Sequence, residues 1–217
     1  MDEFDLNLVA LLAVSTIVGM TPFIMIAITS FVKLSVVLFL IRNAIGVQQT
    51  PPNMILYGLA VILTVYISSP MLAEIYAILS DPSIDYESFA DLQRAAEAAR
   101  EPVRKHLLRY TNPKEREFFL SATARIWPEE AQQIVTSEDL IVLIPSFVVS
   151  ELTRAFEIGF LIYLPFVIID LVVSTILMSL GMIMVSPLVI SVPFKLFLFV
   201  MIDGWSRLMH GLVLTYS

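Results

Sequence analysis

The chain has 217 residues, of which 58% are hydrophobic and only 15% are charged, and its mean hydropathy is +0.84. Because soluble domains carry about 45–50% apolar and about 25% charged residues, this composition excludes an ordinary water-soluble globule, and it equally excludes a disordered chain. The net charge of −7 argues against nucleic acid as a partner. With no cysteine and only two histidines, the chain has no disulfide or thiolate site, and a histidine metal centre is not expected.

The charged residues concentrate in the middle of the chain, where residues 81–140 hold 20 of the 33. This distribution predicts three parts: an N-terminal apolar helical hairpin over 1–80, a small soluble helical domain over 81–140, and a C-terminal apolar helical hairpin over 141–217. The expected fold class is therefore all-α, a helical membrane-type protein in which two long bent hairpins flank the soluble domain.

The N-terminal part opens with an uncharged run from Leu6 to Val32, which exceeds the ~20 residues that a membrane-crossing helix needs. Thr21-Pro22 should kink this run or mark a turn. Residues 46–53 have turn chemistry, and a second uncharged run covers 54–73. We predict two antiparallel apolar helices joined by a short loop. The acidic N-terminus does not resemble a secretory signal peptide, whose first region is basic.

In the middle part, strong helix formers over 91–101 predict a helix that Pro102 interrupts. Asn112-Pro113 predicts the start of another helix, which Trp127-Pro128 ends. An apolar stripe at helical spacing, expected to pack on the rest of the protein, consists of Phe118, Phe119, Ala122 and Ile126.

The C-terminal part predicts a helix that ends at about Leu180, a bend near 181–193, and a helix from Phe194 onward. Arg42 and Lys195 lie near the bends of the two hairpins. Because basic residues favour the cytoplasmic side, we expect these bends in the cytoplasm and the termini and the middle part outside it.

Ten ionisable residues interrupt the apolar parts: Lys33, Arg42, Glu74, Glu151, Arg154, Glu157, Asp170, Lys195, Asp203 and Arg207. Each costs at least ~2.5–3.5 kcal/mol at a bilayer centre, so each must find a partner, face water or lie outside the lipid. Glu151, Arg154 and Glu157 share one helix face, Asp203 and Arg207 are four residues apart, and Lys195 lies on roughly the stripe of Asp203. Their spacing fits neutralisation within a bundle, bridges between subunits, or a proton relay.

Motifs for catalysis are missing: the chain has no phosphate-binding loop, nucleophile elbow, zinc signature or dinucleotide fingerprint. We therefore expect no enzyme, no cofactor and no metal. A glycine-containing bend carries Met182, Ile183 and Met184. Since methionine is flexible and fills irregular gaps, these side chains either pack in a core or seal a lumen.

The stretch PSFVVSELTRAFEIGFLIYLP, residues 145–165, resembles the signature of the FliP/SctR family, the export-gate subunits of flagellar and injectisome type III secretion systems. Three further segments are similar to the same family: GMIMVSP at 181–187, PFKLFLFVMIDGW at 193–205 and GVQQTPPN at 46–53. Thr153-Arg154, residues 160–165 and the missing signal peptide resemble the injectisome branch, SctR.

The resemblance implies a pore-forming structural subunit of an export gate, without catalysis of its own. Such a subunit forms a homopentamer within a cone-shaped helical assembly in the bacterial inner membrane that projects to the periplasmic side. The implied partners are SctS/FliQ-like and SctT/FliR-like membrane subunits, an SctU/FlhB-like switch protein, and the unfolded secreted proteins that pass through the centre.

The resemblance also implies roles for particular residues. Met182, Ile183 and Met184 match a methionine loop that acts as a pore gasket in relatives, although Ile183 departs from the all-methionine version. Inter-subunit or buried charge pairs are expected among Glu151, Arg154, Glu157, Lys195, Asp203 and Arg207. The alternative from the residues alone is a proton- or ion-conducting membrane subunit that uses Glu74, Glu151, Asp170 and Asp203.

Overall fold

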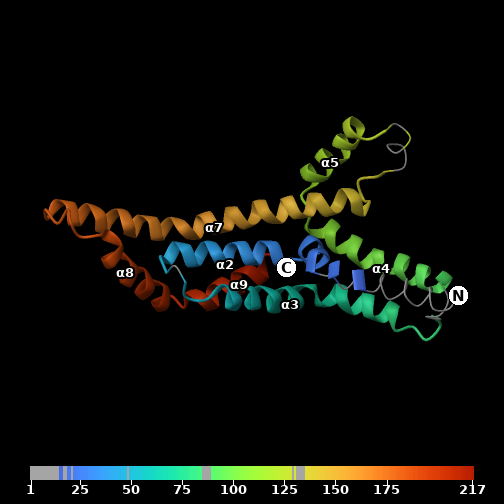
Figure 1. The fold of residues 1–217 in the computed structure, drawn as a ribbon, viewed down its shortest axis with the longest axis horizontal. Helices are drawn as coiled ribbons and strands as arrows, with labels where there is room; N and C mark the ends of the chain where they lie inside the picture. The colour runs from blue at the N-terminus through green and yellow to red at the C-terminus, as the bar shows by residue number, and fades with distance from the viewer. Residues whose placement is uncertain are drawn as a thin grey trace.

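The computed structural model describes residues 15–16, 19–20, 22–47, 49–84, 89–128, 130 and 135–217. Over these ranges the secondary structure is helical and contains no strand, which confirms the predicted all-α class. The helices form an elongated bundle: α7 runs along its length, α2 lies against it, α3 and α9 lie beyond α2, and α4 and α5 lie at one end (Figure 1). The first residues of the predicted apolar run lie outside the described residues.

The N-terminal hairpin consists of α2 (Phe31–Ile45) and α3 (Asn53–Leu79), joined by the short loop that the sequence predicts. A helical stretch, Pro22–Ile28, precedes α2 and is bent from it by 86°. This bend lies at Thr29-Ser30, and the sequence did not predict it; Thr21 lies outside the described residues. The Thr29 hydroxyl donates to the carbonyl of Met25 and accepts from the amide of Phe31, so it satisfies backbone groups that the bend frees.

The main core surrounds α2, because both α3 and α7 pack against this helix. Leu34, Val37, Leu38 and Ile41 on α2 are completely buried. By contrast, α3 buries only a narrow stripe of side chains: Leu56, Ala60, Thr64, Ser68 and Met71. The opposite face of α3 is apolar and exposed, so this helix presents an uncovered apolar surface.

The middle part contains α4 (Phe89–Tyr110) and α5 (Pro113–Ile126). The predicted interruption at Pro102 is wrong, because α4 continues through this residue. Proline removes one hydrogen bond to the preceding turn, and the burial of Leu107 with Val103 against α7 outweighs that loss. The predicted bounds of α5 are confirmed: the Asn112 side chain accepts from the amide of Lys114 at 3.0 Å.

The apolar stripe on α5 stays largely uncovered within the chain. Phe118 is 61% exposed and Ile126 is 76% exposed, so the expectation that the stripe packs on the rest of the protein is wrong for both. The buried residue of α5 is instead Thr123. The reason is that α5 contacts α7 near its own beginning and then diverges from it (Figure 1).

The C-terminal part contains α7 (Leu140–Ser179), α8 (Pro187–Met201) and α9 (Gly204–Leu214). The predicted bend is shorter than expected, because Pro187 begins α8 and Pro193 lies inside it. The sequence also missed a break at Asp203, which has φ 52° and separates α8 from α9 at an angle of 63°.

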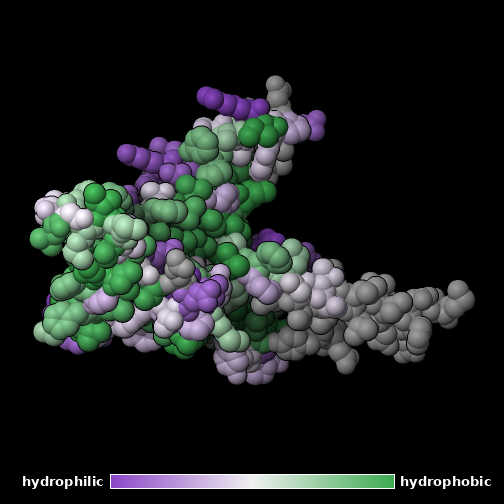
Figure 2. Space-filling model, turned by 60° about the vertical axis from the view of Figure 1, so that its left-hand side comes forward, coloured by the Kyte–Doolittle hydropathy of each residue, from purple (hydrophilic) through white to green (hydrophobic). Residues whose placement is uncertain are grey.

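Among the described residues, two helices, α3 and α7, are long and apolar enough to cross a membrane, and each of the two bent pairs could form a further span. With 40 residues, α7 is ~60 Å long, about twice the ~30 Å thickness of a hydrocarbon core. Hydrophobic side chains gather over the end where α7 and α8 meet, while hydrophilic ones lie on the α5 arm (Figure 2). Lipid or other protein must cover this apolar surface.

Candidate functional site

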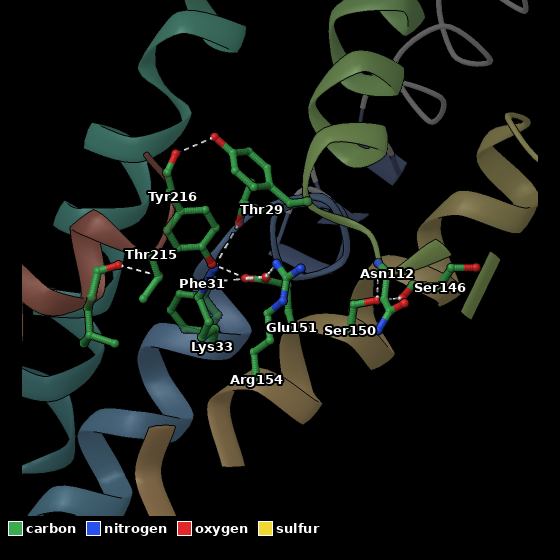
Figure 3. Close-up of polar contacts among 12 residues, drawn as sticks. Thr29, Phe31, Lys33, Asn112, Ser146, Ser150, Glu151, Arg154, Thr215 and Tyr216 are labelled. Carbon is green, nitrogen blue, oxygen red and sulfur yellow. Dashed lines mark hydrogen bonds and ion pairs between the residues drawn. The ribbon is translucent and has the colours of Figure 1, made fainter. Parts of the chain in front are cut away.

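A buried charge cluster lies where α2, α7 and the C-terminal residues meet (Figure 3). Lys33 on α2 and Glu151 on α7 are both 0% exposed, and the Lys33 Nζ lies 3.4 Å from Oε1 of Glu151. The hydroxyl of Tyr216 donates to the other carboxylate oxygen, and the Lys33 Nζ lies 3.4 Å from the centroid of the Tyr216 ring. Arg154, one turn along α7, places Nη1 3.7 Å from Glu151 Oε1.

The polar helix α4 contacts this cluster through its last residue, Tyr110. The hydroxyl of Tyr110 donates to the carbonyl of Tyr216 at 2.9 Å, and the two rings meet edge to face with centroids 5.1 Å apart. One residue before Glu151, the hydroxyl of Ser150 accepts from the amide of Asn112 at 2.9 Å, which fixes the start of α5. The cluster therefore joins α2, α4, α7 and the C-terminal residues.

The chemistry of the cluster is that of a structural ion pair. Two charges removed from water are tolerated when they pair with each other and when further groups satisfy their remaining lone pairs and protons. Here the carboxylate of Glu151 receives Lys33, Tyr216 and Arg154, and the ammonium of Lys33 also contacts the negative face of the Tyr216 ring. Loss of one partner would leave the other charge buried without compensation.

A second buried cation lies at the other end of α2. Lys195 on α8 is 3% exposed, and its Nζ lies 2.5 Å from Oδ2 of Asp170 on α7. The same ammonium donates to the carbonyl of Ala44, in the last turn of α2, at 3.1 Å. A positive charge at this position complements the partial negative charge of a helix C-terminus. Lys195 thus ties α2, α7 and α8 together.

The remaining predicted charges lie at the surface of the chain. Glu157, Asp203 and Arg207 are exposed, and within the described residues none of them forms an ion pair. The helix that carries Lys195, α8, ends at Met201, and Asp203 lies beyond this end, at the break before α9. The predicted stripe that combines Lys195 with Asp203 is therefore wrong, because one straight helix does not contain both.

The loop between α7 and α8 carries the three predicted gasket residues. Met182 is 43% exposed, Ile183 is 84% exposed and Met184 is fully exposed at 101%. Gly181 turns the chain with φ 73°, a conformation that glycine adopts without a steric penalty. The loop forms one tip of the elongated molecule, at the end opposite to α4 (Figure 1).

Sequence reasoning missed several members of the two clusters. Lys33 stood out as a cation in an apolar run, but its partner lies 118 residues away, a separation that helical spacing does not encode. Tyr216 and Tyr110 gave no signal, because a tyrosine near apolar residues is ordinary. Asp170 was noticed as an intramembrane acid, but not as the partner of Lys195.

The described residues contain neither a cluster of metal ligands nor a continuous row of acids. They contain no group of three His, Cys, Asp or Glu side chains placed to hold a metal ion. Of the four acids on which the ion-conductor alternative depends, Glu151 and Asp170 are each paired with a lysine of another helix. Glu74 and Asp203 are exposed.

Comparison with known proteins gives a consistent result over nearly the whole chain. A probable translocation protein of Sinorhizobium fredii, y4yL, is 54% identical over 217 residues, which cover 100% of this chain and 98% of that protein. The Yop proteins translocation protein R of Yersinia pestis is 46% identical, with 98% and 97% covered. The surface presentation of antigens protein SpaP of Salmonella typhimurium is 39% identical, with 98% and 96% covered. The sequence pattern of the FliP family matches residues 14–212, and the chain therefore belongs to the FliP family.

Proposed function

We propose that this chain is a pore-forming structural subunit of a type III secretion export gate in the bacterial inner membrane. Its relatives are named as translocation and secretion proteins, among them a hypersensitivity response secretion protein, HrcR, of Ralstonia nicotianae that is 41% identical. Membership of the family makes the chain a component of a type III secretion apparatus. The proposal adds three points to this: that the chain lines a pore, how many copies assemble, and how the assembly is oriented in the membrane.

The proposal of a pore rests on the exposed loop at the tip of the α7–α8 hairpin. Met182, Ile183 and Met184 form a contiguous exposed apolar group at this tip, and contiguous exposed apolar patches mark interaction sites. When several copies surround one axis, these loops would meet and close the centre with flexible apolar side chains. A ring of this kind excludes ions when the gate is closed and yields when an unfolded protein passes.

The assembly is supported by the large apolar surface that one copy leaves uncovered. We propose a homopentamer joined by SctS/FliQ-like and SctT/FliR-like subunits and contacted by an SctU/FlhB-like switch protein. The exposed charges Glu157, Asp203 and Arg207 would then pair across copies. Because α7 is about twice as long as a bilayer core is thick, part of the assembly would project beyond the lipid, on the periplasmic side together with the soluble part over 81–140.

The stoichiometry is tested by native mass spectrometry of the detergent-solubilised particle, with the chain co-expressed with its neighbouring genes. We expect five copies of this 24.3 kDa chain together with smaller hydrophobic subunits. A stable monomer or dimer without partners would contradict the export gate, and a proton- or ion-conducting subunit would then become the better proposal.

The gasket is tested by replacing Met182, Ile183 and Met184 together with alanine. We expect cells that carry the assembled complex to leak small ions, because the shorter side chains no longer close the centre. A matched control replaces three other exposed apolar residues, Met54, Ile62 and Met201, with alanine and should not leak. Unchanged permeability of the first variant in an intact complex would contradict a gasket at this loop.

A further inference from the structure

A cavity of about 400 Å³ opens beside the buried charge cluster, between α2, the end of α4, α7 and the C-terminal residues. Among the described residues, its polar lining combines three cations, one carboxylate and three hydroxyl groups: Lys33, Arg109, Arg154, Glu157, Tyr110, Thr215 and Ser217. Cations thus predominate over acids in the lining of this cavity, although the chain as a whole carries a net charge of −7.

Two of these cations retain free donors. Arg109, in the last turn of α4, is exposed and forms no ion pair within the described part of the chain; its guanidinium lies 5.4 Å from the centroid of the Tyr110 ring. Arg154 is 39% exposed and reaches Glu151 only through one contact of 3.7 Å. Since a guanidinium has five N–H donors, both side chains can bind a further anion. Lys33 lies deeper in the wall, and its ammonium already pairs with Glu151.

A second cavity, of about 430 Å³, adjoins the first and has a different character. The two cavities share Arg109, Tyr110 and Ser217 in their linings. The walls of the second come from α3 and from the end of α9, and they are mostly apolar: Tyr66, Ile67, Pro70, Val213 and Leu214. A cationic hollow and an apolar hollow therefore meet at Arg109.

We propose that this pair of cavities binds an anionic phospholipid, with the phosphate on Arg109 and Arg154 and one acyl chain in the hollow between α3 and α9. Arginine forks match phosphate oxygens geometrically, and each guanidinium carries a fixed positive charge that an anionic headgroup complements. The location fits, because the polar helix α4 ends here beside the apolar helices α3 and α7. An anionic phospholipid uses both the charge of the first cavity and the apolar lining of the second.

The proposal is tested on the complete assembly purified in a mild detergent. Retention of dioleoyl phosphatidylglycerol is compared with that of dioleoyl phosphatidylcholine by native mass spectrometry. We expect the anionic lipid to be preferred, and Arg109→Gln to lower its affinity by about five-fold. Arg94→Gln is the matched control, because Arg94 lies on the same helix, is 81% exposed and pairs with Asp91; it should leave the preference unchanged.

Further variants distinguish the effect of the arginine charge, the effect of the apolar hollow that holds the acyl chain, and the effect of misfolding. Arg109→Lys should keep the preference for the anionic lipid, whereas Leu214→Gln in the apolar hollow should weaken binding of both lipids. Ile168→Gln, at an exposed position of α7, should leave binding unchanged. Circular dichroism confirms the helix content of each variant, so that a misfolded protein is not mistaken for a lost site.

Three results would overturn the proposal. The first is equal retention of the two lipids, or an unchanged preference in folded Arg109→Gln. The second is that glycerol phosphate, which lacks acyl chains, competes as strongly as the lipid, since the site would then bind a small phosphate. The third is that Arg109→Gln separates the subunits without changing lipid retention, which would assign the cationic hollow to a carboxylate of another protein chain.

Discussion

The pairing of Lys33 with Glu151 is the contact on which the packing of α2 against α7 depends at the residue scale. We predict that Glu151→Gln destabilises the protein by about 3–5 kcal/mol, because it leaves the Lys33 ammonium buried beside a neutral amide. Thermal unfolding in detergent measures this loss. The double variant Lys33→Met/Glu151→Leu should recover most of it, since no uncompensated charge remains. Glu117→Gln, at an exposed position of α5, is the control and should change stability by less than about 0.5 kcal/mol.

A second prediction at this scale concerns His106 on α4. Burial lowers the pKa of His106 from 6.5 to about 4, and the neighbouring Arg109 guanidinium contributes to the same shift. Between these two values the unfolded chain binds a proton that the folded chain does not, so stability falls as the pH drops from 6.5 towards 4, by about 2–3 kcal/mol.

The test is the pH dependence of thermal unfolding for the wild type and for His106→Gln, whose side chain does not titrate. The difference in stability between the two proteins should change between pH 6.5 and pH 4 and stay constant above pH 7. Parallel curves over the whole range would show that His106 is as accessible to protons in the folded protein as in the unfolded one.

At the scale of elements, the crossing of α2 and α7 depends on a glycine. A Cβ added at Gly159 would lie 2.3 Å from Cδ1 of Leu40, so Gly159→Ala forces Leu40 out of its position. We predict a destabilisation of about 1–3 kcal/mol, measured by thermal unfolding. Gly58→Ala is the control: this glycine lies inside α3 with no atom within 4 Å of the added Cβ, and alanine should stabilise it by up to about 1 kcal/mol. Equal effects of the two substitutions would contradict the tight crossing.

The helix ends also show where the identity of adjacent residues is enough to predict structure. Asn112-Pro113 and Trp127-Pro128 mark the ends of α5 correctly, because capping is decided by adjacent residues. Pro102 and Pro193 did not end their helices, since the packing of neighbouring turns outweighs a single lost hydrogen bond. The break at Asp203 was missed although Asp203-Gly204 is a turn dipeptide and aspartate tolerates the left-handed conformation, because the apolar run around it favoured one continuous helix.

At the scale of the whole molecule, hydropathy and charge were enough to predict an all-helical chain with two apolar hairpins. They were not enough to predict which charges meet. Lys33 and Glu151 are brought together by the packing of α2 on α7, and Lys195 meets Asp170 through the turn at 180–186. Hydropathy measures removal from water, and it does not distinguish burial in lipid from burial against another helix.

Tyr216 gives a prediction at the same scale, because it connects α4 to the α2–α7 pair. Tyr216→Ala removes a buried ring that packs edge to face on Tyr110 and the hydroxyl that donates to Glu151, and we expect a loss of about 3–5 kcal/mol. Hydrogen exchange should accelerate at the end of α4 as well as around Lys33. Tyr76→Ala, at a 74% exposed position, is the control. Faster exchange around Lys33 alone would show that α4 is held by other contacts.

The position of Tyr216 in the chain has a consequence for the order of synthesis. Lys33 leaves the ribosome long before Glu151 is made, and Tyr216 emerges after all the helices. Until Glu151 emerges, the Lys33 ammonium has no buried acid to meet and must remain hydrated or be held by another protein, and until Tyr216 emerges, Glu151 lacks the hydroxyl that donates to it. The N-terminal hairpin therefore cannot reach its final packing before Glu151 and Tyr216 have been translated. A nascent chain that stops short of Tyr216 does not present a closed polar core to its neighbours.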